Sequence, residues 1–150
     1  MDREVVMVVE DTTADATHLE LQLEGIEEVG EIIIAEDGFV ALGMLREMDR
    51  RGNAFPTLIF LDLRMPRVDG FQFLEAFEHY HPHHRSRVVV VTGSASDPDR
   101  IKALEYRSVE NYVVKPVFRI DIQRVLRASW DEASGVVRNG RQATKELPSR

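Results

Sequence analysis

The sequence contains no cysteine, which excludes a disulfide framework and any chemistry that depends on a thiolate. No apolar run approaches the roughly 18 residues that a membrane-spanning helix needs. The chain starts Met-Asp-Arg-Glu and passes directly into a short apolar run, without the basic start and longer apolar stretch of a signal peptide. These absences fit a cytoplasmic protein without membrane insertion, and we expect that location.

Positive charge is also in deficit, since the net charge is -7. A chain this acidic is a poor candidate for sequence-independent binding to nucleic acid, and we expect no direct nucleic-acid partner. Its 150 residues, 43% hydrophobic and 30% charged, are typical of one globular domain with a buried core. We predict a single domain over residues 1–131 and a polar C-terminal tail over residues 132–150.

Five short apolar runs predict buried strands, at Val5–Val9, Ile32–Ala35, Leu58–Leu61, Val88–Val91 and Tyr112–Val114. A helical segment follows each run, and Gly30 is expected to end the first strand–helix unit. The helical faces are Ala16/Leu19/Leu23/Ile26, Ala41/Leu45/Met48, Phe73/Phe77/Tyr80 with Asp69 as cap, a short helix from Ser96 or Asp97 to about Tyr106, and Ile122/Leu126/Trp130. Leu19, Leu21 and Leu23 also alternate, so a strand is the weaker alternative there. The alternation predicts an α/β fold, a doubly wound parallel sheet of flavodoxin-like type ordered 2-1-3-4-5.

Polar residues stand where these strands end. Glu10 and Asp11 follow the first strand, Asp62 the third, Thr92 the fourth and Lys115 the fifth. In such a sheet, ligands bind at the carboxyl ends of the strands, where the strand order reverses. We therefore expect three carboxylates to converge beside one hydroxyl and one ammonium. Each residue alone also has a purely structural interpretation, such as a turn-forming Asp62 or a surface Lys115.

This constellation suggests phosphoryl transfer to a carboxylate. An acidic cluster holds a hard divalent cation through oxygen ligands, and we expect Mg²⁺ as the cofactor. The cation and Lys115 neutralise charge on the phosphoryl oxygens, and Thr92 can hydrogen-bond one of them. Asp62 is the predicted nucleophile, which would form an aspartyl-phosphate.

Five segments in order closely resemble the receiver domain of two-component response regulators, of the stand-alone, chemotaxis-regulator-like type. The resemblance covers about residues 4 to 131. The segments are Val8-Val9-Glu10-Asp11, Leu61-Asp62-Leu63-Arg64-Met65-Pro66, Asp69-Gly70, Val91-Thr92-Gly93 and Val114-Lys115-Pro116. Glu10 departs from the pattern, since many members have Asp there, but it keeps the charge.

The resemblance implies roles for particular residues. Asp62 would receive phosphate from the phosphohistidine of a partner. Asp11, Asp62 and the backbone carbonyl of Arg64 would hold Mg²⁺, with Glu10 assisting.

By the same resemblance, Thr92 and Tyr112 would form a switch pair that relays the phosphorylation state to the surface of the fourth helix, fifth strand and fifth helix. Arg64 and Ser94, two positions beyond Asp62 and Thr92, would flank the path of the hydrolytic water. We expect Arg64 to slow self-dephosphorylation by forking onto phosphoryl oxygens and covering the path of the water. The alternative is that Arg64 points to solvent and meets only a partner protein.

The implied partners are a sensor histidine kinase or histidine phosphotransfer protein and a downstream target, reached by docking or by phosphorelay. We expect no output domain, and either a monomer or a homodimer through the fourth helix, fifth strand and fifth helix. The chain would be a phosphoacceptor switch rather than an enzyme, limited to its own phosphorylation and dephosphorylation.

Two other classes are weighed against this one. A Mg²⁺-dependent phosphatase of the haloacid dehalogenase type needs a second Asp two positions after the nucleophile, where Arg64 stands. A nucleotide-binding module needs a glycine-rich loop after the first strand, where Glu10-Asp11-Thr12-Thr13 stands.

His79, His81, His83 and His84 fall within six positions and have the residue type of a metal site. Pro82 interrupts any helical register, and no acidic residue or cysteine partners them locally. A solvated loop is the expectation here.

Overall fold

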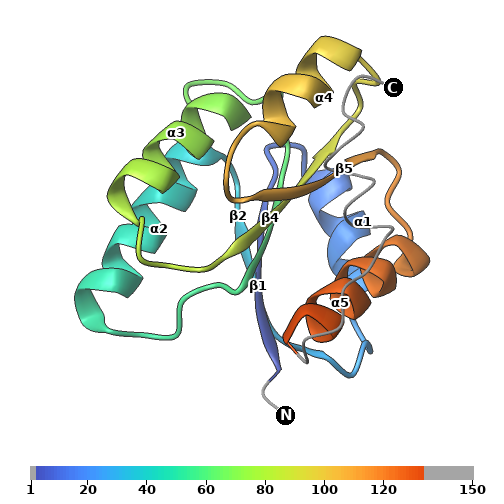
Figure 1. The fold of residues 1–150 in the computed structure, drawn as a ribbon, viewed down its shortest axis with the longest axis horizontal. Coiled ribbons are helices and arrows are strands. Elements are labelled where there is room, and N and C mark those ends of the chain that lie inside the picture. Colours follow the sequence, from blue (N-terminus) through green and yellow to red (C-terminus); the bar gives the residue numbers. More distant parts are fainter. Residues whose placement is uncertain (1–2, 134–150) are drawn as a thin grey trace.

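A computed structural model describes residues 3–133 (Figure 1). Five strands and five helices alternate along this part of the chain. Their bounds are β1 (Glu4–Val9), α1 (Thr13–Leu23), β2 (Val29–Ala35), α2 (Gly38–Arg51), β3 (Leu58–Leu61), α3 (Gly70–Tyr80), β4 (Arg87–Thr92), α4 (Asp97–Leu104), β5 (Val109–Val114) and α5 (Arg119–Ala133). All strand pairs are parallel, in the order β2-β1-β3-β4-β5, which confirms the predicted fold class.

The sheet lies between two layers of helices. Helices α1 and α5 cover one face, while α2, α3 and α4 cover the other (Figure 1). Alternate residues of β1 serve the two layers, since Met7 and Val9 pack in the α2–α3 core and Val6 and Val8 in the α1–α5 core. Burial on both faces explains why the central strands are unbroken apolar runs.

β2 and β5 each start three residues earlier than their apolar runs. β2 starts at Val29, and the expectation that Gly30 ends the first unit is wrong, because Gly30 lies inside this strand. β2 is at the edge of the sheet, so part of it is exposed and its sequence is mixed. β5 starts at Val109, which pairs with Val88, although its first half contains the charged Glu110.

The loop after β3 is held in place by the start of α3. Asp69 and Gln72 form a reciprocal capping box there, which confirms the predicted cap. A Cβ on Gly70 would lie 2.7 Å from the Cα of Leu63 and 2.8 Å from the carbonyl oxygen of Asp62. Only glycine permits this close approach, and it fixes the turn that follows Asp62.

The expected C-terminal tail falls almost wholly outside the described residues. Positions 132 and 133 still belong to α5, and residues 134–150 are not described. None of the helices within residues 3–133 has the length and apolar composition of a membrane span.

Candidate functional site

Lys115 lies among three carboxylates at the carboxyl edge of the sheet. Its Nζ is 2.7 Å from Oε1 of Glu10, 2.8 Å from Oδ2 of Asp15 and 3.4 Å from Oδ2 of Asp62. The positions directly after β1, β3 and β5, and the first turn of α1, thus each supply one charged group. The structure brings the predicted Glu10, Asp62 and Lys115 together and adds Asp15, which the sequence reasoning placed only in a helix turn.

Glu10, Asp11 and Asp62 also offer carboxylate oxygens that all lie within 4.8 Å of one another. Glu10 and Asp62 are buried, whereas Asp11 is exposed at the rim. The amide of Arg64 donates to Oδ1 of Asp62 at 3.4 Å. An oxygen-only donor set open to water on one side fits a hard cation such as Mg²⁺, which keeps several water ligands.

Glu10 and Lys115, which form the shortest of these contacts, both have shifted pKa values. Burial raises the pKa of Glu10 to about 7, and the charge of Asp62 adds to this, while hydrogen bonds from Lys115 and Thr12 oppose it. Burial disfavours the charged form of Lys115, but hydrogen bonds to Asp15 and Glu10 and the charge of Asp62 outweigh it and raise its pKa. Lys115 is therefore charged at neutral pH. The raised pKa of Glu10 means that its carboxyl group changes protonation state near neutral pH.

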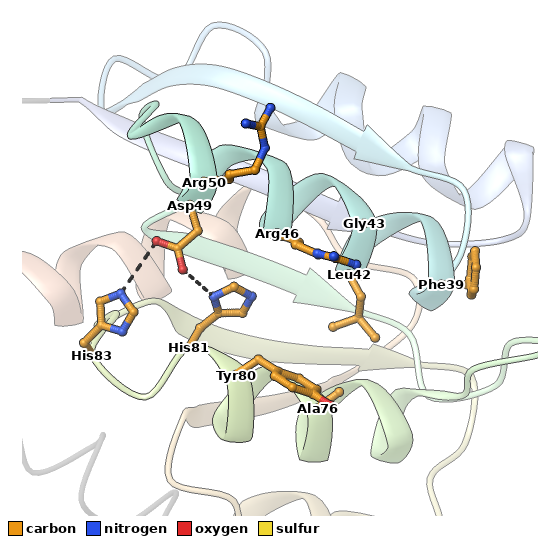
Figure 2. Close-up of a pocket in the computed structure, with 10 residues that line it drawn as sticks. All are labelled: Phe39, Leu42, Gly43, Arg46, Asp49, Arg50, Ala76, Tyr80, His81 and His83. Atoms are coloured by element: carbon orange, nitrogen blue, oxygen red, sulfur yellow. Dashed lines mark hydrogen bonds and ion pairs between the residues drawn. The ribbon is translucent and has the colours of Figure 1, made fainter.

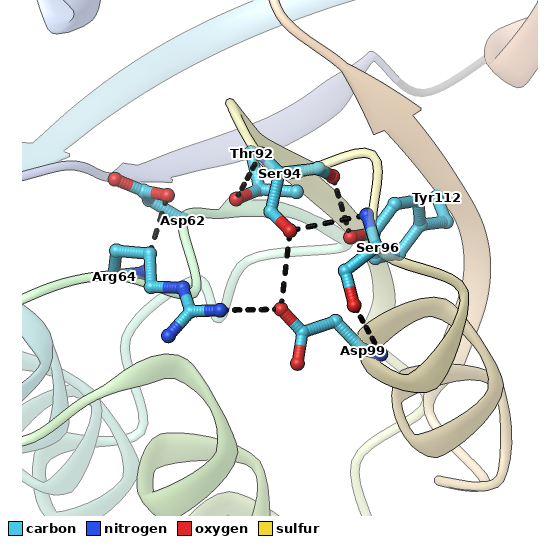
Figure 3. Close-up of polar contacts among 7 residues, drawn as sticks. All are labelled: Asp62, Arg64, Thr92, Ser94, Ser96, Asp99 and Tyr112. Carbon is cyan, nitrogen blue, oxygen red and sulfur yellow. Dashed lines mark hydrogen bonds and ion pairs between the residues drawn. The ribbon is translucent and has the colours of Figure 1, made fainter.

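Thr92 and Tyr112 are connected through the loop that follows β4 (Figure 3). Thr92 is fully buried, and its hydroxyl oxygen accepts a hydrogen bond from the amide of Ser94 at 3.3 Å. The hydroxyl of the half-buried Tyr112 donates to the carbonyl oxygen of Ser94 at 2.8 Å. A displacement of this loop would therefore change the hydrogen bonds of both Thr92 and Tyr112.

Arg64 lies beside the loop and is paired with α4. Its Nη2 is 2.6 Å from Oδ2 of Asp99, and the guanidinium side chain is 71% exposed (Figure 3). The same Asp99 oxygen accepts a hydrogen bond from Oγ of Ser94 at 3.2 Å. Asp99 was not predicted as a site residue, and its position in the acidic first turn of α4 was the available signal.

The expectation of a solvated loop for the histidines is wrong for His81 and His84. His81 is buried, and both rings bond to Asp49, which lies more than 30 positions earlier in the chain. The acidic partner that the local sequence lacks is supplied by the C-terminal turn of α2.

Residues 6–127 match the family model of the response regulator receiver domain. The chain is 33% identical over 137 residues to the probable methanogenesis regulatory protein FilR2 of Methanothrix harundinacea, a match that covers 87% of this chain and 88% of that protein. It is also 33% identical over 112 residues to the response regulator Rcp1 of Synechocystis sp., which covers 74% of this chain and 76% of Rcp1.

Solved structures agree with these matches. The Mn²⁺-bound form of Rcp1 superposes with a TM-score of 0.68 at 28% identity, over 90% of this chain and 97% of that one. A two-component response regulator from Cytophaga hutchinsonii superposes with a TM-score of 0.79 over 87% of this chain and 99% of that one, and at 22% identity it supports the fold alone. Two further curated relatives are longer, and the chain spans 37% and 56% of their lengths.

Proposed function

The chain belongs to the response regulator receiver family, and from that premise we propose that Asp62 accepts a phosphoryl group from a histidine kinase or a histidine phosphotransfer protein. Members of this family are signalling switches. The observation that carries the proposal is the position of Asp62, a buried carboxylate that belongs to the acidic cluster and lies 3.4 Å from the ammonium of Lys115.

In the proposed transfer, a carboxylate oxygen of Asp62 attacks the phosphorus of the donor's phosphohistidine. The new O–P bond forms as the P–N bond breaks, and the electron pair returns to the imidazole nitrogen. Lys115 lies close enough to Asp62 to neutralise charge on the transferred group. The hydroxyl of Thr92 would donate a hydrogen bond to a phosphoryl oxygen.

Glu10, Asp11 and Asp62 would hold Mg²⁺, together with the backbone carbonyl of Arg64. A bound divalent cation supplies positive charge that offsets the negative charge of the phosphoryl oxygens. The carboxylate cluster and the Mn²⁺-bound form of the relative Rcp1 support this part of the proposal.

The proposed output is a change in protein–protein contacts in the cytoplasm. Phosphate on Asp62 would draw in Thr92, and the loop contact between Ser94 and Tyr112 would pass the change to α4, β5 and α5. That surface would meet a downstream target, a further phosphorelay protein or a second copy of the chain.

The test is the intact mass of the protein after incubation with a small phosphodonor and Mg²⁺. We expect wild type and Asp97→Asn, an exposed acidic control in α4, to gain one phosphoryl group each. Asp62→Asn should gain none. Phosphorylation of Asp62→Asn to the wild-type extent would refute the assignment, and steady turnover of a small phosphoester would favour a phosphatase instead.

A further inference from the structure

Three imidazoles gather around one carboxylate at the end of the molecule opposite Asp62. Asp49 lies in the last turn of α2, and His81, His83 and His84 lie in the connection from α3 to β4. Figure 2 shows Asp49 with His81 and His83. Both helices run from the carboxyl edge of the sheet to its amino edge, so this cluster is far from the carboxylate site. The function proposed for Asp62 makes no use of it.

The contacting atoms have the spacing of ligands around a small cation. Oδ1 of Asp49 is 3.1 Å from Nε2 of His84 and 3.6 Å from Nε2 of His83. One ligand atom from each of the three residues lies within 4.8 Å of the others. Tetrahedral Zn²⁺ with ligand bonds of about 2.0–2.1 Å places neighbouring ligand atoms about 3.3 Å apart. The two oxygen–nitrogen separations lie on either side of that value.

The surrounding contacts hold two of these groups in orientation. Nδ1 of the buried His81 is 3.0 Å from Oδ2 of Asp49, which leaves Oδ1 directed toward the other two rings. The ring of His84 stacks on Phe55, with centroids 3.5 Å apart and planes 6° from parallel. A hydrogen-bonding partner behind a ligating group is the usual arrangement at protein metal sites.

We propose that Asp49, His83 and His84 form a binding site for a divalent transition-metal ion of the zinc class, with His81 positioning Asp49. Two imidazole nitrogens and one carboxylate oxygen suit Zn²⁺, Co²⁺ or Ni²⁺ and are a poor set for Mg²⁺. The side chain of His83 is 63% exposed, so the ion can enter from solvent and a water can complete the coordination. The bound ion ties the end of α2 to the connection between α3 and β4.

The experiment is a Zn²⁺ titration of the full chain by calorimetry in excess Mg²⁺, which is added to compete with Zn²⁺ for the proposed carboxylate site. We expect one Zn²⁺ per chain in wild type and in Asp62→Asn. The Asp62→Asn variant separates this site from the proposed phosphoacceptor. Its Zn²⁺ binding does not depend on whether Asp62 accepts phosphate.

His83→Ala is the decisive variant, because its exposed ring contributes little packing. We expect it to weaken Zn²⁺ binding by at least about tenfold. The matched control is His79→Ala, an exposed histidine on α3 that is outside the cluster and should bind as wild type does. Asp49→Asn and His84→Ala should weaken binding as well.

Thermal unfolding gives a second readout, since a ligand that binds only the folded state raises the midpoint. Zn²⁺ should raise the midpoint of wild type and His79→Ala, and raise that of His83→Ala less. Absence of Zn²⁺ binding by wild type in excess Mg²⁺, or equal affinities for His83→Ala and His79→Ala, would overturn the proposal.

Discussion

Arg64 and Asp99 form an ion pair, with Nη2 and Oδ2 2.6 Å apart, that joins the loop after β3 to the first turn of α4. Ser94 contacts the same carboxylate oxygen. The two residues expected to flank the water that hydrolyses the phosphoryl group therefore share one partner. That partner holds the guanidinium of Arg64 before any phosphate is present.

The lifetime of the phosphorylated state should depend on this pair. Asp99→Asn removes the charge that holds Arg64 and leaves the guanidinium able to fork onto phosphoryl oxygens. About 1 kcal/mol of added stabilisation of the phosphorylated state would slow phosphate loss about fivefold. Arg64→Asn should speed the loss. The measurement is the decay of phosphorylated protein, followed by intact mass with Mg²⁺ present.

Asp97→Asn is the matched control, since Asp97 lies in the same turn of α4 but pairs with Arg100. Its phosphate should decay at the wild-type rate. If Arg64→Asn loses phosphate no faster than wild type, Arg64 does not shield the phosphoryl group.

Mg²⁺ binding should depend on pH through Glu10. Burial raises the pKa of Glu10 to about 7, so below that pH the group is largely neutral and the cation must displace its proton. Affinity should therefore rise as the pH increases from about 6 to about 8 and then level off. Calorimetric titration with Mg²⁺ at several pH values measures this.

Two variants separate Glu10 from its neighbour in the cluster. Glu10→Gln should bind Mg²⁺ with an affinity that changes little over this pH range. Asp11→Asn should bind more weakly than wild type but keep the rise with pH. A wild-type affinity that stays constant across pH 7 would show that Glu10 exchanges no proton on binding.

Arg87 and Glu110 form a largely buried ion pair between β4 and β5. Nη1 of Arg87 is 2.7 Å from Oε2 of Glu110, with side chains 14% and 6% exposed. Glu110→Gln leaves the guanidinium charge uncompensated and should lower the free energy of unfolding by about 3 kcal/mol. Urea denaturation monitored by circular dichroism measures the change.

Glu47→Gln provides the comparison for this pair. Glu47 bridges Arg50 and Arg51 on the surface of α2, where solvent screens the charges. Glu47→Gln should therefore change the free energy of unfolding little. Equal midpoints for the two variants would mean that the buried pair contributes no more than an exposed one.

Most of the sheet was predictable from the sequence because its central strands are buried on both faces. Leu58–Leu61 is an unbroken apolar run, and its predicted bounds are those of β3. The predicted segment for β2 is too short because an edge strand tolerates Gly30 and polar neighbours, which interrupt the apolar pattern. The strand-end residues Glu10, Asp62 and Lys115 were predictable as neighbours because parallel strands end at one edge.

Partners of these residues were not predictable from local patterns. Lys115 contacts Asp15 across 100 positions, Arg64 contacts Asp99 across 35, and Asp49 meets His84 across 35. Periodicity shows which side of a helix is apolar, but it carries no information about which charged groups meet across two elements. These contacts are the ones that determine where Arg64 points and whether the histidines have an acidic partner.

Backbone amide NMR shifts, recorded before and after addition of a small phosphodonor with Mg²⁺, test most directly that Asp62 is the acceptor of a phosphorylation switch. In wild type we predict shift changes around Asp62 and at Thr92, Ser94, Tyr112 and the start of α4. Thr92, Tyr112 and Asp99 all hydrogen-bond to Ser94, so a phosphoryl group that draws in Thr92 should disturb the whole set. Asp62→Asn should show none of them. Changes of the same pattern in Asp62→Asn, or changes in wild type confined to β1 and α1, would contradict the account.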